Sequence, residues 1–491
     1  MFARMPSQRQ LLIACACVSI ATTTARGMQP PAPTEPVAEL RWNSGVPDSR
    51  EDGAATSMVG LNAHLRSVHS RAFSLGPFGV TARLAPEVAI TGNGAFPAFT
   101  SGDPLRHPAA SPFYFGAYSA DLPSRRRSGA RLWPGESGIW LHRPTARLGV
   151  ATGIARWGPG VGEGLVIGRS APGIARIEAQ IERRIGERHD VRLSWFSGMV
   201  RESNAFDADP DNDRRSISGV RLTYDLADPV PLAFGVSRTV MDGRRGGYTV
   251  GRAARDALLP FGRSPTDSTL ELLAADVTMS AASTGTLAWL ETVRQAPVRS
   301  AGGLLRTPTN GLAFRLGLSQ RIRATARATW TGELEFVRLD QPTQRSDEPA
   351  TDLYTSATVV HGWTHDGQLL GSGLGPGGQR QVVRLTRESA IWSAKLFLER
   401  ARWNEDALFR QPDPFSDRHD VTLQGGLAVG HVLAGYDVTA SLVWGTRFNY
   451  QFEGASASAD GTPADVGILR LGLSLRPRKP EGGRTPSLGL H

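Results

Sequence analysis

The sequence contains very little cysteine. Of its 491 residues only Cys15 and Cys17 are cysteines, and both lie in an N-terminal segment that we expect to be removed. A mature chain without cysteine has no disulfide bond, no zinc site built on thiolates and no cysteine nucleophile. Its stability must therefore come from hydrogen bonds and packing.

Long apolar runs are also lacking, and the one clear run lies near the N-terminus. Arg4 and Arg9 precede an apolar segment over 11–21, and small residues follow it. A basic start, a short apolar core and a small-residue cleavage site are typical of a secretory signal peptide, whereas a membrane-spanning helix needs about 20 apolar residues. We predict a signal peptide over 1–25, with lipidation of Cys15 as the alternative.

Lysine is rare as well, since Lys395 and Lys479 are the only two. Arginine therefore carries nearly all of the basic charge, and the formal net charge is +9. A basic balance favours anionic partners, among them acidic glycans and the phosphates of outer-membrane lipid. Because we predict export, nucleic acid is not an expected partner.

No linker divides the chain. A soluble protein of this length would normally form two or more domains, yet the 55 glycines are scattered evenly along the sequence. Turn-forming residues spread evenly along a chain favour one large β-structure with many strands. We assign 26–40 to a Pro-rich N-terminal segment, 41–476 to the β-structure with its loops, and 477–491 to a polar C-terminal tail.

Apolar and polar residues alternate along many segments. From Ile322 to Thr331 every even position is apolar and every odd one is polar, and the pattern continues to Phe336. Because successive side chains of a strand point to opposite faces, such a segment is a strand between two different environments. The same alternation occurs over 176–182, 191–195, 220–226 and 469–476.

The charged alternate face decides between β architectures. Burying unpaired charges in a soluble sandwich would cost several kcal/mol each, as an order of magnitude. In a transmembrane barrel the apolar face meets lipid and the charged face meets the lumen. We therefore predict an all-β protein, a transmembrane antiparallel β-barrel, with a soluble sandwich or propeller as the alternative. The non-alternating stretches 93–125, 251–263 and 371–378 are expected loops or plug segments, with a short helix around 253–259.

One motif is more specific than this pattern. Arg156 precedes a Trp-Gly-Pro-Gly turn over 157–160, and 164–167 and 170–172 follow it. These residues resemble the signature of the capsule assembly protein Wzi family, although Ser170 replaces an asparagine. Other segments fit the family in the same order, and the resemblance spans about 41–476. They are 49–54, 60–62, 134–139, 373–378 and 395–399.

The resemblance implies a function as well as a fold. Members of the Wzi family are outer-membrane barrels, expected to have about eighteen strands and small helical plug segments. They bind capsular polysaccharide and help to hold it on the cell surface, in a lectin-like manner and without known catalysis. The expected partner of this chain is therefore a capsular or other exopolysaccharide, of acidic character, bound by a monomer.

The same motif supplies the candidate site. Arginines pair with carboxylates through bidentate hydrogen bonds, and an aromatic face can stack on a sugar ring. The candidate polysaccharide-binding residues are Arg156, Trp157, Arg169 and Arg176. The alternative is a purely structural turn, because proline fixes φ and glycine permits positive φ. The residues of this structural motif are Gly158, Pro159, Gly160, Gly375, Pro376 and Gly377.

We expect no metal, no cofactor and no enzymatic activity. The acidic run 207–213 lacks the glycine and the glutamate of a calcium-binding loop. His361 and His365 lie where a strand runs into a loop, so their spacing does not place them on one face of a helix. No Gly-x-Ser-x-Gly elbow is present. The remaining alternative to polysaccharide binding is a passive porin that favours anions.

Overall fold

The computed structural model describes most of the predicted β-structure. The described residues are 36–53, 55–92, 94, 129–155, 157–159, 163–202, 213–227, 230–243, 250–261, 268–296, 311–340, 353–356, 359, 361–406, 419–450 and 465–478. The predicted signal peptide 1–25, the tail from 479 onward and the acidic run 207–212 lie outside them. No helix in the described part of the chain is long and apolar enough to cross a membrane.

The regular secondary structure of the described residues is almost entirely β-strand, so the predicted all-β fold is confirmed. Twenty-one strands form one antiparallel sheet. They are β1 (Val37–Asn43), β4 (Gly60–Arg66), β5 (His69–Leu75), β6 (Phe78–Leu84), β7 (Glu87–Thr91), β8 (Gly129–Trp133), β9 (Gly138–Arg143), β10 (Ala146–Ala151), β11 (Ala175–Ile185), β12 (His189–Arg201), β13 (Arg214–Leu226), β14 (Leu232–Asp242), β15 (Thr269–Ala281), β16 (Thr286–Ala296), β17 (Leu312–Ala324), β18 (Thr329–Arg338), β21 (Gln379–Glu388), β22 (Trp392–Trp403), β23 (Asp420–Leu433), β24 (Tyr436–Phe448) and β25 (Val466–Pro477).

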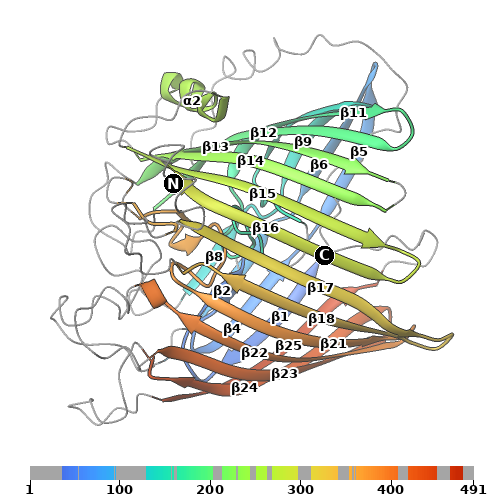
Figure 1. Ribbon diagram of the computed structural model, residues 1–491, viewed down its shortest axis with the longest axis vertical. Coiled ribbons are helices and arrows are strands. Elements are labelled where there is room, and N and C mark those ends of the chain that lie inside the picture. The colour runs from blue at the N-terminus through green and yellow to red at the C-terminus, as the bar shows by residue number, and fades with distance from the viewer. Residues whose placement is uncertain are drawn as a thin grey trace.

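Each long strand pairs with its neighbours in the sequence, and β1 pairs with both β25 and β4. The order of pairing therefore leads back from the last strand to the first (Figure 1). Three wall strands are interrupted, because β4 with β5, β6 with β7 and β8 with β9 each continue one path. The number of wall strands depends on whether each interrupted strand is counted once or twice, so the expected eighteen strands stay a prediction. β1 begins at Val37, inside the segment predicted as Pro-rich.

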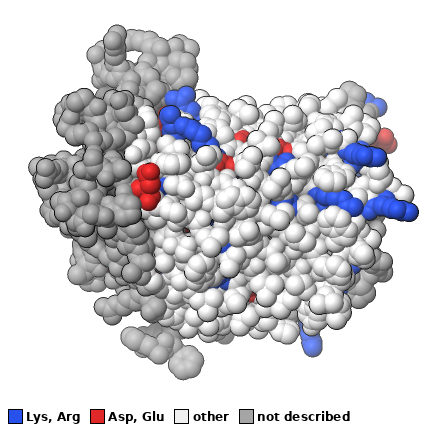
Figure 2. All heavy atoms as spheres, turned by 90° about the horizontal axis from the view of Figure 1, so that it is seen from below, with Lys and Arg blue, Asp and Glu red and all other residues white. Residues whose placement is uncertain are grey.

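Most outward side chains of the strands are apolar. On β25, Leu469, Leu471 and Leu473 are exposed, whereas Arg470 between them points inward and pairs with Asp48 at 2.8 Å. This is the alternation expected when one face meets lipid and the other a polar lumen. Figure 2 shows most of the described outer surface free of charge, with Lys and Arg side chains near its two ends, some beside the grey atoms and others at the opposite end.

The alternating run from Ile322 to Phe336 does not form the single strand that its pattern predicts. β17 ends at Ala324, a turn follows, and β18 begins at Thr329. The Thr325 hydroxyl accepts the Ala328 N–H at 3.1 Å, and the Thr325 N–H donates to the Ala328 carbonyl at 2.9 Å. A side chain therefore closes a tight turn without interrupting the alternation of the sequence.

Connections are short at one end of the barrel and long at the other (Figure 1). The short turns include 76–77, 144–145, 186–188 and 434–435, while the long connections include 152–174, 243–268 and 339–378. Such asymmetry is typical of outer-membrane barrels, whose longer loops lie on the extracellular side. We call these the short-turn end and the long-loop end.

The described helix is not part of a plug. α2 (Val250–Asp256), followed by the 3-10 turn η3 (Leu259–Phe261), overlaps the helix predicted around 253–259. Asp256 accepts hydrogen bonds from the hydroxyls of Ser216 and Ser218 on β13. These serines alternate with Ile217, which faces the buried core, so α2 packs against the outer face of β13.

Candidate functional site

Two connecting segments fill the barrel interior toward the long-loop end. They are 163–174 and the described part of 353–378, which includes the hairpin of β19 (Thr364–His365) and β20 (Gln368–Leu369). Their apolar side chains pack against inward residues of the wall. The buried cluster contains Leu165, Ile167, Tyr354, Trp363 and Leu374 together with Phe196, Ile217, Met241, Leu272, Val293 and Val337. We call the two segments the plug; its described residues are turns and a short hairpin rather than the expected helices.

Hydrogen bonds join the two plug segments into one body. The Trp363 indole N–H donates to the Val166 carbonyl at 2.8 Å, and the Tyr354 hydroxyl donates to the Leu165 carbonyl at 2.5 Å. Gly371 lies so close to the Tyr354 ring that a Cβ there would come within 2.5 Å of it. Close packing inside the barrel therefore requires a glycine at position 371, within the glycine-rich stretch predicted as a loop.

Charged residues on the inner wall hold the plug from the side. Arg315 on β17 pairs with Glu335 on β18 at 2.9 Å and donates to the Glu163 carbonyl of the plug at 2.6 Å. Arg380 on β21 pairs with the same Glu335 carboxylate, and its guanidinium reaches Glu163 at 3.5 Å. The Leu165 N–H donates to Glu291 on β16 at 3.0 Å. The predicted charged inner face thus lies inside the barrel and contacts the plug.

Trp157 faces the inner wall rather than open space. Its ring meets Phe196 of β12 edge-on, with centroids 5.0 Å apart, and lies over Gly219 of β13. Gly158 has a φ of 129°, and its carbonyl accepts from Arg221 at 3.4 Å. This geometry favours the structural alternative for the turn. Arg156 and Gly160 lie outside the described residues.

The other candidate residues are dispersed. Arg176 on β11 is buried and pairs with Glu178 at 2.7 Å. Arg169 is half-buried in the plug, where its carbonyl accepts the Gly53 N–H at 2.6 Å. The structural glycines Gly375 and Gly377 have φ values of 73° and 67° and lie buried beside Pro376. The binding roles predicted for Arg156, Trp157, Arg169 and Arg176 stay predictions.

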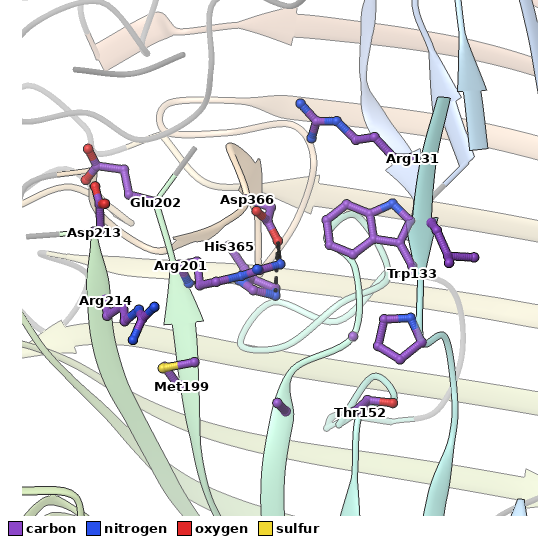
Figure 3. Close-up of a pocket in the computed structure, with 14 residues that line it drawn as sticks. Arg131, Trp133, Thr152, Met199, Arg201, Glu202, Asp213, Arg214, His365 and Asp366 are labelled. Atoms are coloured by element: carbon purple, nitrogen blue, oxygen red, sulfur yellow. Dashed lines mark hydrogen bonds and ion pairs between the residues drawn. The ribbon is translucent and has the colours of Figure 1, made fainter. Parts of the chain in front are cut away.

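A cavity that the sequence did not reveal opens at the long-loop end (Figure 3). Its volume is about 760 Å³. β8 pairs with β7 along one edge, and no other described strand pairs with its second edge, because β10 ends at Ala151 and β11 begins at Ala175. The wall is therefore notched between β8 and the end of β12. The residues that carry side chains to this notch include Arg131, Trp133, Met199, Arg201, Arg214 and Asp366.

The tip of the plug hairpin forms the back of the notch. Asp366 and Gly367 both have positive φ, as a two-residue hairpin turn of this type requires. Asp366 pairs with the Arg201 guanidinium at 3.0 Å, and the Arg201 N–H donates to Nδ1 of His365 at 3.0 Å. Burial lowers the pKa of His365 to about 4, although the Asp366 carboxylate acts in the opposite direction. The imidazole is therefore neutral at pH 7 and accepts a hydrogen bond.

A second cavity, of about 860 Å³, extends toward the short-turn end. It lies inside the barrel beside β1 and β22 to β25, and Arg41, His431 and Arg470 are among its polar lining residues. Arg41 pairs with Glu39 at 2.8 Å. No cluster of three metal-binding side chains occurs in the described part of the chain.

The wall and its interior define a class of protein: a transmembrane antiparallel β-barrel of the outer-membrane type. Among solved structures, the chain is similar to Wzi, an outer membrane protein involved in group 1 capsule assembly in Escherichia coli and a carbohydrate-binding β-barrel. The TM-score is 0.58 at 12% identity, over 91% of this chain and 85% of that one. The resemblance inferred from the motifs is thus confirmed as a likeness of fold.

Other solved structures match with lower TM-scores. The outer membrane protein OprD of Pseudomonas aeruginosa has a TM-score of 0.42 at 10% identity, covering 90% of this chain and 92% of that one. OccAB2 of Acinetobacter baumannii has a TM-score of 0.43 at 9% identity, with 90% and 97% covered. The sequence matches no protein-family model and no curated protein sequence.

Proposed function

We propose that this protein binds a surface polysaccharide, capsular or another exopolysaccharide, and supports its attachment or assembly at the outer membrane. The observation that carries the proposal is the plug. Trp363 and Tyr354 are fully buried within it, and the buried Arg315 and Arg380 hold it to three strands of the wall. A lumen filled by a fixed body suits binding at the rim better than passage of solutes.

The likeness to Wzi supports the same proposal. That protein is a carbohydrate-binding barrel, and this chain shares its fold over most of both lengths. At 12% identity the likeness concerns the fold, so carbohydrate binding is carried to this chain only as a proposal. No catalytic step forms part of it.

The partner that we propose is an acidic polysaccharide. The net charge is +9, and arginine carries nearly all of the basic charge. Guanidinium groups bind carboxylates in a bidentate manner, and a repeating ligand sums many weak contacts. We further propose export by the signal peptide 1–25, contact of membrane lipid with the exposed leucines, and a monomeric state.

A passive porin that favours anions is the second candidate. The cavity at the short-turn end favours it, since Arg41, Arg470 and Arg476 are among its lining residues. The two functions make opposite demands on the lumen, because a porin requires a continuous aqueous path and an attachment protein does not.

The test is a binding assay combined with conductance on one preparation. The full protein, purified in detergent, is titrated with the surface polysaccharide of its own producing organism at low and high salt. The same preparation is inserted into a planar lipid bilayer. Salt-sensitive binding with negligible conductance is the expected result. Steady open-channel current without polysaccharide binding would overturn the proposal in favour of the porin.

A further inference from the structure

The notch between β8 and β12 has the size and the side chains of a ligand site. Its volume of about 760 Å³ falls within the range of roughly 300–1,000 Å³ that is usual for small-ligand pockets. We infer that this notch is the subsite for one carboxylate-bearing sugar unit of the polysaccharide. The inference rests on the proposed function and adds the place and the chemistry of recognition.

The two sides of the notch differ in origin. On β8, Arg131 and Trp133 pair with the buried Ala89 and Glu87, whereas Leu132 between them is 75% exposed. Arg131 and Trp133 therefore belong to the inner face of β8. On β12, alternation places Met199 and Arg201 on the outer face. A ligand in the notch would thus contact inner-face residues of β8 and outer-face residues of β12 at once.

Two arginines of the notch are available to bind an anion. Arg201 is engaged by Asp366 at 3.0 Å, and its charge is therefore balanced. Arg131 and Arg214, in contrast, form no ion pair with any residue that the structure describes, and both are exposed. Figure 3 places them on opposite sides of the cavity. A carboxylate that enters beside either would replace water on a guanidinium without breaking an existing ion pair.

Trp133 supplies a surface for the sugar ring itself. The indole is partly buried and lies on the same strand as Arg131, two residues away and on the same face (Figure 3). An aromatic side chain offers a large apolar contact area that is rigid before the ligand arrives. Trp133 and Arg131 can therefore contact one ligand from the same face of β8.

The carboxylates of the notch favour a sugar over a phosphate. Asp213, Asp366 and Glu202 line the same cavity. Sugar hydroxyls need such hydrogen-bond acceptors, because a hydroxyl that loses water without a partner weakens binding. A lipid phosphate, which carries up to about two negative charges, would be repelled by the exposed Asp213 more strongly than a sugar unit that carries a single carboxylate. We therefore assign the notch to polysaccharide, and lipopolysaccharide phosphate becomes an outcome of the test.

The experiment compares two forms of one ligand. The surface polysaccharide of the producing organism is used as isolated and after chemical reduction of its carboxylates to alcohols. Affinities are measured for the full protein and for Arg131→Ala, Trp133→Ala and Arg214→Ala, with Arg327→Ala as matched control. Arg327 is an exposed arginine in the turn between β17 and β18, at the short-turn end. Correct folding of each variant is checked by its heat-dependent migration on gels.

We expect carboxylate reduction to weaken binding by the wild-type protein roughly tenfold, which corresponds to about 1.4 kcal/mol. Arg131→Ala should weaken binding of the native form by a similar factor but leave binding of the reduced form unchanged. Trp133→Ala should weaken both forms, and Arg327→Ala neither. Both arginines are exposed, so neither alanine variant should disturb folding. If one of them does not fold, the other still tests the notch.

The possible failures are distinguishable. If the wild-type protein binds neither form, the proposed function itself is wrong. If it binds the native polysaccharide but the notch variants bind like the wild type, only the notch is excluded. Equal binding of both forms by the wild type would overturn the requirement for a carboxylate. Binding of the wild type and the notch variants to vesicles that contain lipopolysaccharide is measured as well. If the notch variants lose this binding but still bind the polysaccharide, the notch is assigned to lipid instead.

Discussion

The guanidinium of Arg315 and the carboxylate of Glu335 form an ion pair of 2.9 Å inside the barrel, with side-chain exposures of 1% and 0%. Arg380 pairs with the same carboxylate from the next strand. Three neighbouring strands therefore share one buried negative charge, and the Glu163 carbonyl of the plug accepts from Arg315. The charge network thus links the wall to the plug.

This network predicts a large effect of removing its carboxylate. Glu335→Gln keeps the size of the side chain but leaves Arg315 and Arg380 without their shared counter-charge. Breaking a buried pair in this way costs about 3–5 kcal/mol. The midpoint of thermal unfolding in detergent should fall markedly. Glu182→Gln is the control. Glu182 pairs with Arg192 at 3.4 Å, and both side chains are about one-third exposed. Ion pairs that are exposed to this extent contribute roughly 0–1 kcal/mol. Equal midpoints for the two variants would contradict the network's role.

The plug predicts a second effect, on conductance. Trp363→Ala removes a fully buried indole and its hydrogen bond to the Val166 carbonyl. The loss should destabilise the plug by about 3–5 kcal/mol. Trp363→Phe keeps most of the packing and loses mainly one hydrogen bond, at about 1 kcal/mol. In planar bilayers, openings should be frequent for the alanine variant and rare for the phenylalanine variant. Silent traces from a correctly folded Trp363→Ala protein would show that the plug does not close the lumen.

Much of the wall could be predicted from the sequence, because its cause is local. Leu469, Leu471 and Leu473 alternate with polar residues, and the structure exposes these leucines as the pattern requires. The turn at Thr325 was missed, because it depends on one side-chain hydrogen bond that leaves the alternation intact. The alternation of apolar and polar residues alone does not show where one strand ends and the next begins.

The candidate site was harder to predict, because it depends on contacts between distant residues. Trp157 stands out in the sequence, yet its ring packs on Phe196 inside the barrel. The notch combines Arg131 with Asp366, which belong to segments far apart in the chain. An arginine and a tryptophan alternating at 131 and 133 were a possible signal. Their meaning depends on β8 ending beside a gap, which no local pattern records.

Acid should loosen the plug hairpin. Burial lowers the pKa of His365 to about 4, whereas an unfolded histidine has a pKa near 6.5. Between these values the unfolded residue binds a proton that the folded one excludes, so stability is complete above about pH 6.5 and falls as the pH drops toward 4. The loss is at most roughly 3 kcal/mol. Protonated Nδ1 would also face the Arg201 N–H, donor against donor.

Hydrogen exchange of residues 361–370 at pH 7.5 and pH 5, corrected for intrinsic rates, measures this effect. Exchange should be faster at pH 5 in the wild-type protein. His365→Gln keeps an acceptor for the Arg201 N–H but has no group that titrates, so its exchange should depend little on pH. His431→Gln, at the cavity of the short-turn end, is the control and should behave like the wild type. A pH dependence that survives in His365→Gln would assign it to another group.

The two faces of the wall should respond oppositely to a new charge. Leu471 of β25 lies on the outer face, where it pairs with Leu442 and Trp42, whereas Thr439 of β24 lines the inner cavity. Leu471→Arg would place a guanidinium in lipid near the middle of a strand, at a cost of about 2–4 kcal/mol. Thr439→Arg adds the same group to a cavity of about 860 Å³ that already holds arginines. Folding yield into lipid vesicles, followed by heat-dependent gel migration, should therefore fall for Leu471→Arg and stay near wild type for Thr439→Arg. Equal yields would mean that the leucine face does not contact lipid, and the barrel would then have to be reassigned to an aqueous environment.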